Sequence, residues 1–389
     1  MDLSAIFLAL AGLFFAGLLA DHVGRTTRLP RVTMLLGCGI AAGGAGLDLI
    51  PETVAAWFDV LSIVALTMVA FLLGGSLTRD TLRAHGAVIV TISLAIVLAT
   101  LATVAAGLWL AGLPLVPALL LAAIATATAP AATTDVILQS GVDNGFTRTL
   151  EGIVAIDDVW GLVVFSLVLA VIAGDGLGEA GGAALLLGAV REIFGALLLG
   201  LAIGVPAAVL TGRLSPGEPL QTEALGIVFL VAGASIGLEV SYLICAMTVG
   251  AVVANLATHH TRAFDEIEHI RWPFMLLFFV LAGALLEPAA LYEVGLIGLL
   301  YVALRAGARI AGGWLGATLA GAPRPERPWY GVALMPQAGV AVGMALIASE
   351  AVPEWADAIL ALTIGTTVLF ELVGPLGTQL AISRMAQRP

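Results

Sequence analysis

Two adjacent acids, Asp157 and Asp158, interrupt an apolar segment that covers residues 152–170. A carboxylate at mid-membrane depth costs at least about 2.5–3.5 kcal/mol, and such residues usually mark an ion or proton site. Neighbouring carboxylates also oppose each other's ionisation, so one of the two should hold a proton near neutral pH. Such a pair can exchange protons for cations, whereas a purely structural role would need a dedicated partner for each acid. We therefore take the pair as the candidate site.

The composition indicates an all-α membrane protein. The chain of 389 residues is 60% hydrophobic and 11% charged, and apolar stretches recur along its whole length. Because a span needs about 20 mainly apolar residues, these stretches predict transmembrane helices, and they lack the alternation of a membrane β-barrel. The first helix has no cleavage signal and is expected to be retained. The two cysteines indicate neither a disulfide nor a metal site, and the net charge of −11 argues against nucleic-acid binding.

Thirteen segments are predicted to span the membrane. All sixteen basic residues are Arg, and all but three of them fall in every second connection or in the C-terminal tail. By the positive-inside rule, this alternation places the N-terminus outside and the C-terminus in the cytoplasm. The approximate limits of the spans are 3–20, 32–50, 55–77, 86–112, 115–138, 148–173, 183–211, 222–237, 240–257, 272–289, 294–320, 329–350 and 354–383.

Two of the three remaining Arg lie inside the predicted span 294–320. Arg305 and Arg309 are four residues apart and therefore share one face of that helix, with apolar sequence around both. An intramembrane cation needs an anion, and the aspartate pair is the obvious partner for Arg309. Arg305 is equally well explained as a residue that caps exposed backbone carbonyls.

An internal repeat points to the same region. The spans 115–138 and 329–350 each carry a mid-span proline, Pro130 and Pro336, followed by small or polar residues such as Gln337. Proline frees a backbone carbonyl, which in lipid must find another partner. The two spans are an odd number of crossings apart, so they would run in opposite directions across the membrane. Paired broken helices in inverted repeats indicate a transporter site near the membrane midplane.

These patterns together resemble the monovalent cation/proton antiporter superfamily, over nearly the full length of the chain. Ala155-Ile-Asp-Asp158 is similar to the two-aspartate motif of the electrogenic, thirteen-helix bacterial sodium/proton antiporters. Four further stretches resemble that branch: the entry to helix 2, the two broken helices, and the segment that carries an essential Lys where this chain has Arg309. They read Leu29-Pro-Arg-Val-Thr-Met-Leu-Leu-Gly-Cys-Gly39, Ala127-Thr-Ala-Pro-Ala131, Pro336-Gln-Ala-Gly-Val340 and Arg305-Ala-Gly-Ala-Arg-Ile-Ala-Gly312.

The resemblance implies one membrane transporter unit over residues 1–389, built from two subdomains. The dimer subdomain would comprise approximately residues 1–85 and 183–257 and would form a homodimer. The core, or ion-translocation, subdomain would comprise approximately residues 86–173 and 272–383. It would hold the two crossed, discontinuous helices and the aspartates, and would move past the dimer subdomain so that the site opens to each side in turn.

The resemblance also assigns roles to individual residues. Asp158 would bind the transported Na⁺ and the proton, helped by Thr126 and Thr128 at the first helix break, while Asp157 would pair with Arg309. The implied activity is secondary antiport of Na⁺ (or Li⁺ or K⁺) against protons in a bacterial inner membrane. Neither enzymatic activity nor a cofactor is expected, and Asp158 and Thr128 are the expected Na⁺ ligands.

The chain departs from the electrogenic pattern at Arg309. A buried Lys can lose its proton, whereas Arg stays charged at accessible pH, so Arg309 cannot carry a second proton. The number of protons exchanged per cation therefore stays open. Gln337 occupies a stretch in which some relatives carry a carboxylate. Glu371, a buried acid in the last span, matches a family pattern of structural role, and Arg305 is a candidate partner for it.

Three other classes of membrane protein share some of these features. A potassium/proton antiporter of the efflux type shares the membrane fold but carries a long regulatory domain, which is not expected because the chain ends shortly after the last span. An intramembrane aspartyl protease needs its two aspartates on separate helices, whereas Asp157 and Asp158 are adjacent. A sodium-coupled organic-anion symporter has ten helices and lacks the aspartate pair. The first and the last remain as alternative functions.

Overall fold

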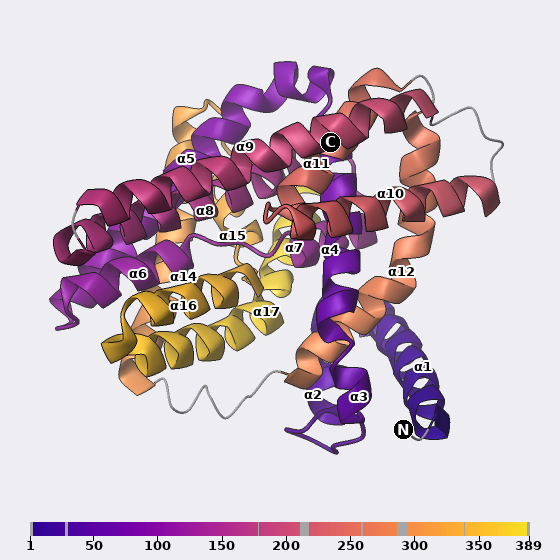
Figure 1. Ribbon diagram of the computed structural model, residues 1–389, viewed down its shortest axis with the longest axis horizontal. Coiled ribbons are helices and arrows are strands. Elements are labelled where there is room, and N and C mark those ends of the chain that lie inside the picture. Colours follow the sequence, from indigo (N-terminus) through magenta and orange to yellow (C-terminus); the bar gives the residue numbers. More distant parts are fainter. Residues whose placement is uncertain are drawn as a thin grey trace. The chain divides into compact units, whose positions relative to one another are not determined.

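The computed structural model describes residues 3–27, 30–177, 179–210, 218–257, 260–285, 295–337 and 339–386. Within these ranges a number of residues, Asp158 and most of residues 173–186 among them, are described by their backbone alone. Every regular element in the described ranges is a helix (Figure 1). The chain divides into two compact units: Met1–Ala84 with Arg191–Leu286 (unit 1), and His85–Val190 with Glu287–Pro389 (unit 2).

Unit 1 is held together by close helix packing. The tightest approaches use glycines: Gly74 of α4 lies against the backbone of Met247 in α11, and Gly39 of α2 lies against the backbone of Val280 in α12. Small residues at such positions let two helix backbones come together without a large side chain between them. Its elements are α1 (Leu3–Thr27), α2 (Arg31–Ala42), α3 (Glu52–Ala55), α4 (Phe58–Ser76), α10 (Glu218–Gly237), α11 (Tyr242–Leu256), α12 (His260–Leu285) and the second half of α9 (Glu179–Leu210).

Unit 2 is built around two interrupted helices. The first is α6 and α7, separated by residues 126–129, and the second is α15 and α16, separated by residues 334–338. The backbone N–H of Ala129 donates a 3.0 Å hydrogen bond to the carbonyl of Pro336, so the two breaks touch each other. The elements are α5 (Arg79–Leu110), α6 (Leu115–Ala125), α7 (Pro130–Ser140), α8 (Gly145–Leu177), α14 (Gly295–Leu319), α15 (Trp329–Ala333), α16 (Gly339–Ala351), η1 (Pro353–Trp355) and α17 (Ala356–Ala386).

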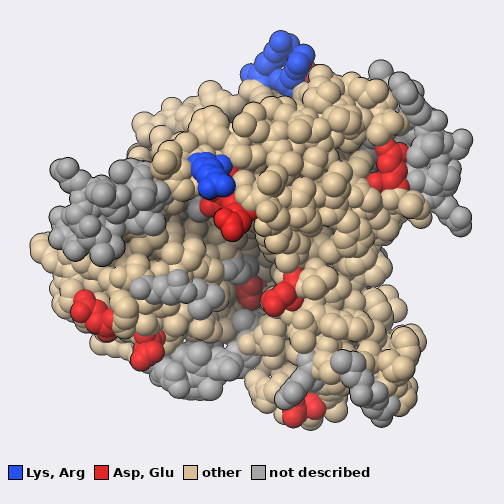
Figure 2. Space-filling model, viewed as in Figure 1, with Lys and Arg blue, Asp and Glu red and all other residues tan. Residues whose placement is uncertain are grey.

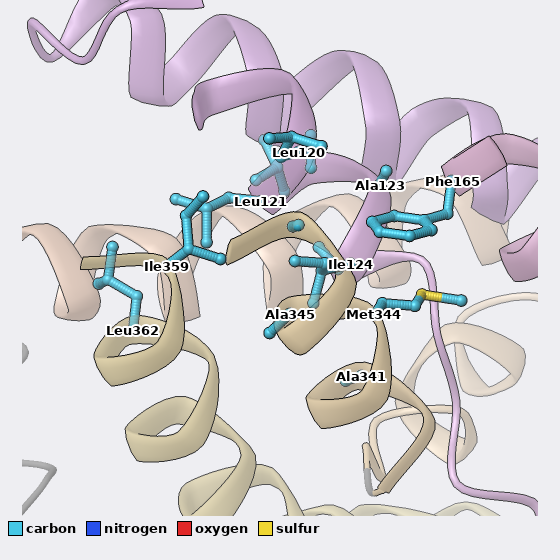
Figure 3. Close-up of a cluster of buried hydrophobic side chains, with 14 of the residues drawn as sticks. Leu120, Leu121, Ala123, Ile124, Phe165, Ala341, Met344, Ala345, Ile359 and Leu362 are labelled. Atoms are coloured by element: carbon cyan, nitrogen blue, oxygen red, sulfur yellow. The ribbon is translucent and has the colours of Figure 1, made fainter. Parts of the chain in front are cut away.

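Local sequence explains the breaks. Pro130 is the first residue of α7, where its missing N–H is not needed, and it cannot continue α6. Pro336 lies within the second break, because proline has no backbone N–H to continue α15. A hydrophobic cluster from six helices, α5, α6, α8, α14, α16 and α17, includes Ala127 of the first break (Figure 3). Its labelled members are Leu120, Leu121, Ala123 and Ile124 of α6, Phe165 of α8, Ala341, Met344 and Ala345 of α16, and Ile359 and Leu362 of α17.

Each of the thirteen predicted spans overlaps a helix or an interrupted helix pair. Nine helices in the described ranges are long and apolar enough to cross a membrane, and four more apolar helices are shorter. One face of the surface consists largely of residues other than Lys, Arg, Asp and Glu (Figure 2), and large side chains such as Phe7 and Phe15 are exposed. The prediction of an all-α protein agrees with these features, while the count of thirteen crossings stays a prediction.

Two of the differences from the expected boundaries have a clear physical reason. Residues 272–285 were assigned to the core subdomain, but they form the second half of α12, which packs against α2 and α4 inside unit 1. The hydropathy of a segment shows that it is buried but not which neighbours bury it. The second span was expected over residues 32–50, yet α2 ends at Ala42 because the following Gly43 and Gly44 favour a turn over a helix.

The contact between α14 and α15 gives the first testable prediction. A Cβ on Gly313 would lie 2.7 Å from the Cα of Gly331, a backbone atom that cannot move aside, whereas a Cβ on Gly307 would meet nothing within 4 Å. Gly313→Ala should therefore destabilise the protein by about 1–3 kcal/mol. Gly307→Ala, on the exposed face of the same helix, should stabilise it by about 0.5–1 kcal/mol. Melting temperatures in detergent measure both, and equal shifts would contradict the packing described.

Candidate functional site

Asp157 lies at the centre of unit 2 and is fully buried. Both of its carboxylate oxygens have a protein partner. The hydroxyl of Ser93 in α5 donates to Oδ1 at 2.6 Å, and Nη2 of Arg309 in α14 donates to Oδ2 at 3.2 Å. The side chains of Asp157 and Arg309 are each 0% exposed. The ion pair that we expected between them is therefore present.

Close packing of α5, α8 and α14 brings these three side chains together. A Cβ on Gly312 of α14 would lie 2.9 Å from the Cα of Ile96, and one on Gly316 would lie 2.8 Å from the Cα of Ile92. The α14 backbone therefore runs directly against the α5 turn that carries Ser93. On the other side, Gly152 of α8 lies against the side chain of Ile89, also in α5.

Arg309 links the aspartate to the first helix break. Its Nη1 donates to the carbonyl of Thr126 at 3.1 Å, while its Nε makes no hydrogen bond within the described part of the chain. The Thr126 hydroxyl donates to the carbonyl of Ala123 at 2.7 Å, which leaves its lone pairs available to a cation. The Thr128 hydroxyl is buried and makes no hydrogen bond to any residue that the structure describes.

Arg305 contacts both helix breaks and none of the acids whose side chains the structure describes. Its Nε and Nη2 donate to the carbonyls of Ala125 and Ala127 at 3.0 and 2.9 Å, and its Nη1 donates to the carbonyl of Met335 at 2.9 Å. Its Cζ lies 4.1 Å from the centre of the Phe370 ring. Of the two explanations left open above, capping of carbonyls is the one that the structure supports.

The suggested pairing of Arg305 with Glu371 is wrong. Phe370 directs its ring at Arg305, and the next residue of a helix points about 100° away from it. All three nitrogens of the guanidinium are used by carbonyls. No hydrogen bond or ion pair joins Glu371 to any residue that the structure describes, so its predicted structural role has no contact that explains it.

Gln337 joins the second break to the first. Its side chain is fully buried, and its Nε2 donates to the carbonyl of Ile124 at 3.1 Å. Its Oε1 has no hydrogen-bond partner in the described ranges. Tyr301, one turn before Arg305 on α14, is also fully buried. Three residues of α14 spaced by four, Tyr301, Arg305 and Arg309, thus face the crossing.

Asp158 follows Asp157 in α8, and its side chain lies outside the described part of the structure. Its expected role as the cation and proton carrier therefore stays a prediction.

The sequence also matches a known protein family over most of its length. The family model described as "sodium/hydrogen exchanger, transmembrane" matches residues 9–382. The chain belongs to the sodium/hydrogen exchanger family. The match covers both units, both helix breaks and the acid pair, and it makes the protein a cation/proton antiporter in the broad sense of the family.

Solved structures show the same fold for this exchanger. It is similar to the sodium proton antiporter MjNhaP1 from Methanocaldococcus jannaschii at pH 8, with a TM-score of 0.72, 18% identity, and coverage of 98% of this chain and 100% of that one. An electron-microscopy map of the same antiporter gives a TM-score of 0.75, 19% identity, and coverage of 99% and 96%. No curated protein matched the chain. The prediction of an all-α polytopic membrane protein with the antiporter fold is confirmed.

The donor set of the exchanger's site suits a hard monovalent cation. Around Asp157 the structure places carboxylate, hydroxyl and carbonyl oxygens, and oxygen donors are those that alkali and other hard cations prefer. In the described ranges no group of three or more His, Cys, Asp and Glu comes together. The cation is the substrate of a sodium/hydrogen exchanger, and Asp157, Thr126 and Thr128 supply described oxygens at this candidate site.

Two residues near the candidate site, Ser93 and Tyr301, were not predicted from the sequence. Ser93 lies in an apolar helix among other small residues, and serine is common in membrane helices, so the sequence carries no signal for its contact with Asp157. Tyr301 could have been found, because it stands four residues before Arg305 and eight before Arg309, on the face that these two residues define.

Removal of one partner of the buried pair gives the second prediction. Asp157→Asn would leave Arg309 as a buried cation without its anion, which should cost about 3–5 kcal/mol of stability. The control is Asp143→Asn, which breaks the bridge between Asp143 and Arg148, whose side chains are 71% and 54% exposed. A hydrogen bond from Arg148 lowers the pKa of Asp143, but an exposed bridge contributes little. Melting temperatures in detergent should fall sharply for Asp157→Asn alone, and a similar small effect of both changes would refute this account.

Proposed function

We propose that the protein exchanges a monovalent cation, Na⁺ or alternatively Li⁺ or K⁺, for protons by alternating access at Asp157 and Asp158. One observation carries the proposal: a fully buried carboxylate, held by a hydroxyl and a guanidinium, lies beside the crossing of two broken helices. Intramembrane acids in that setting mark ion and proton pathways. Membership of the exchanger family favours antiport over the organic-anion symport considered above.

The contacts of Asp157 support a division of labour between the two aspartates. Arg309 keeps its charge at accessible pH, and Ser93 can donate only one proton to the carboxylate, so both partners favour the ionised form of Asp157. Asp157 is then a fixed anion. Asp158 is the remaining acid of the pair and carries either the cation or the proton, with the hydroxyls of Thr126 and Thr128 as further cation ligands.

Coupling follows from competition for Asp158. When Asp158 binds a cation or a proton, its charge is neutralised and the site can cross the membrane. An empty site keeps an uncompensated charge, and the cost of moving that charge through a low-dielectric region holds it in place. Exchange then needs no separate proton channel.

The same contacts favour one proton per cation. A second proton would require either Arg309 or Asp157 to change its charge during the cycle. Arg309 cannot lose a proton at accessible pH, and Asp157 would have to break a buried ion pair to gain one. We therefore propose electroneutral exchange, in contrast to the electrogenic branch that the Asp-Asp motif resembles.

The orientation and the oligomer are part of the proposal. The distribution of Arg supports an N-terminus outside and a C-terminus in the cytoplasm of a bacterial inner membrane. Unit 1, which contains most of the expected dimer subdomain, would form the homodimer, and unit 2 would carry the ion across.

The role of Asp158 gives the third prediction. Asp158→Asn removes the carboxylate that would bind both the cation and the proton, so it should abolish exchange without unfolding the protein. The measurement is cation-driven pH change in proteoliposomes with Na⁺, Li⁺ and K⁺ in turn, with Asp143→Asn as a folded and active control. Normal flux in Asp158→Asn would refute the assignment, and the absence of cation-dependent flux in the wild type with all three ions would refute the function.

Electroneutral exchange gives the fourth prediction. With fixed ion gradients, clamping the membrane potential at different values should leave the wild-type flux unchanged. Arg309→Lys should keep the pair with Asp157 and retain exchange, because Lys also carries a positive charge. Arg309→Ala should lose stability, because it leaves Asp157 buried without a counter-charge.

Two outcomes would contradict this account. A flux that reverses at a potential set by two protons per cation would exclude electroneutral exchange. An inactive Lys variant beside a stable and active Ala variant would show that Arg309 does not hold the site.

A further inference from the structure

We propose that Arg305 is a positioning residue that serves as a permanently bound cation. Its guanidinium occupies a cage of carbonyls formed by both helix breaks and keeps the transported cation out of it. The inference rests on the proposed function for its effect on transport, whereas the cage itself is described by contacts inside unit 2.

The cage is formed by oxygens from both interrupted helices. Ala125 and Ala127 contribute carbonyls from the first break, Met335 contributes one from the second, and the three bonds measure 2.9–3.0 Å. The Phe370 ring closes one face at 4.1 Å, a distance at which an aromatic face attracts a cation. The side chain of Arg305 is 0% exposed. The three carbonyl acceptors and the ring face therefore match the N–H groups and the flat face of a guanidinium.

Carbonyl oxygens at the end of a helix also bind alkali cations. They carry the negative end of the helix dipole, and rings of such oxygens replace the hydration shell of an ion in channels. With Arg305 absent, the cage would offer three such oxygens close to the transport site. A cation held there would be bound without being carried by Asp158. The apparent affinity for the cation would therefore rise, and turnover would slow.

The neighbouring carbonyls are engaged in the same way. Gln337 donates to the carbonyl of Ile124 and Arg309 to that of Thr126, so side-chain donors engage each carbonyl from Ile124 to Ala127. The proposed cation ligands are instead the hydroxyls of Thr126 and Thr128 and the carboxylate of Asp158. Arg305 thus directs the cation towards the acid pair, and it holds α14 in the register that points Arg309 at Asp157.

The test is chemical rescue of Arg305→Ala by guanidinium chloride at millimolar concentrations, with methylammonium chloride as the control salt. The variant should melt at a lower temperature than the wild type, and guanidinium should raise that temperature saturably while methylammonium does not. The wild type, whose cage is filled, and Asp143→Asn, which changes an exposed loop, should show no such rise. Equal effects of the two salts on Arg305→Ala would overturn the proposal.

Transport provides the second readout. In proteoliposomes, Arg305→Ala should show an apparent KM for the cation that is lower by about tenfold, the equivalent of one charge-assisted contact, together with slower turnover. Guanidinium should compete for the cage and reverse both changes. A residue that only supports the fold would change the turnover and leave KM unaltered, so an unaltered KM would overturn the proposal.

Two further results separate the possible failures. If guanidinium stabilises Arg305→Ala but the wild type exchanges no cation, the cage stands and the proposed function fails. If Arg305→Ala cannot be isolated, Arg305→Lys carries the test, because its ammonium keeps the charge but cannot reach three carbonyls in one plane. That variant should melt below the wild type and gain nothing from guanidinium, and a wild-type melting temperature would overturn the proposal.

Discussion

The structure of unit 2 depends on how free backbone carbonyls are satisfied where two helices are broken inside an apolar protein. A helix end leaves its last carbonyls without intrahelical partners, and lipid offers none in their place. Here the partners come from side chains: two guanidiniums of α14, the amide of Gln337 and the hydroxyl of Thr378, which donates to the carbonyl of Ala333 at 2.7 Å. The crossing is therefore held by fixed donors, and the remaining contacts of the site follow from where these donors lie.

Two Arg one turn apart on a helix repel each other, and burial adds a desolvation cost for both. The structure separates their roles. Arg305 spreads its charge over three carbonyls and an aromatic ring, while Arg309 divides its donors between the carbonyl of Thr126 and the carboxylate of Asp157. One cation thus belongs to the scaffold, and the other joins the scaffold to the acid pair.

The sequence predicted the features that arise from local chemistry. Pro130 and Pro336 mark the two breaks because proline cannot continue a helix, and the spacing of Arg305 and Arg309 places both on one face. It did not predict contacts that depend on which helices become neighbours. Ser93 meets Asp157 only because glycines let α14 and α8 approach α5, and α12 joins unit 1 because its small residues fit those of α2. Periodicity identifies a buried face but not the element that covers it.

The ion pair of Asp157 and Arg309 is not explained by stability. Apolar residues of similar volume can replace a buried ion pair at no cost, and often with a gain, because each charge must be desolvated. A carboxylate that had only to fill space would thus be poorly placed at this depth. Under the proposed function, the pair keeps a negative charge next to Asp158 in the chain, with both oxygens of Asp157 already engaged. That charge is balanced by a guanidinium that does not titrate, which supports the proposal that the second acid of the pair binds the cation and the proton.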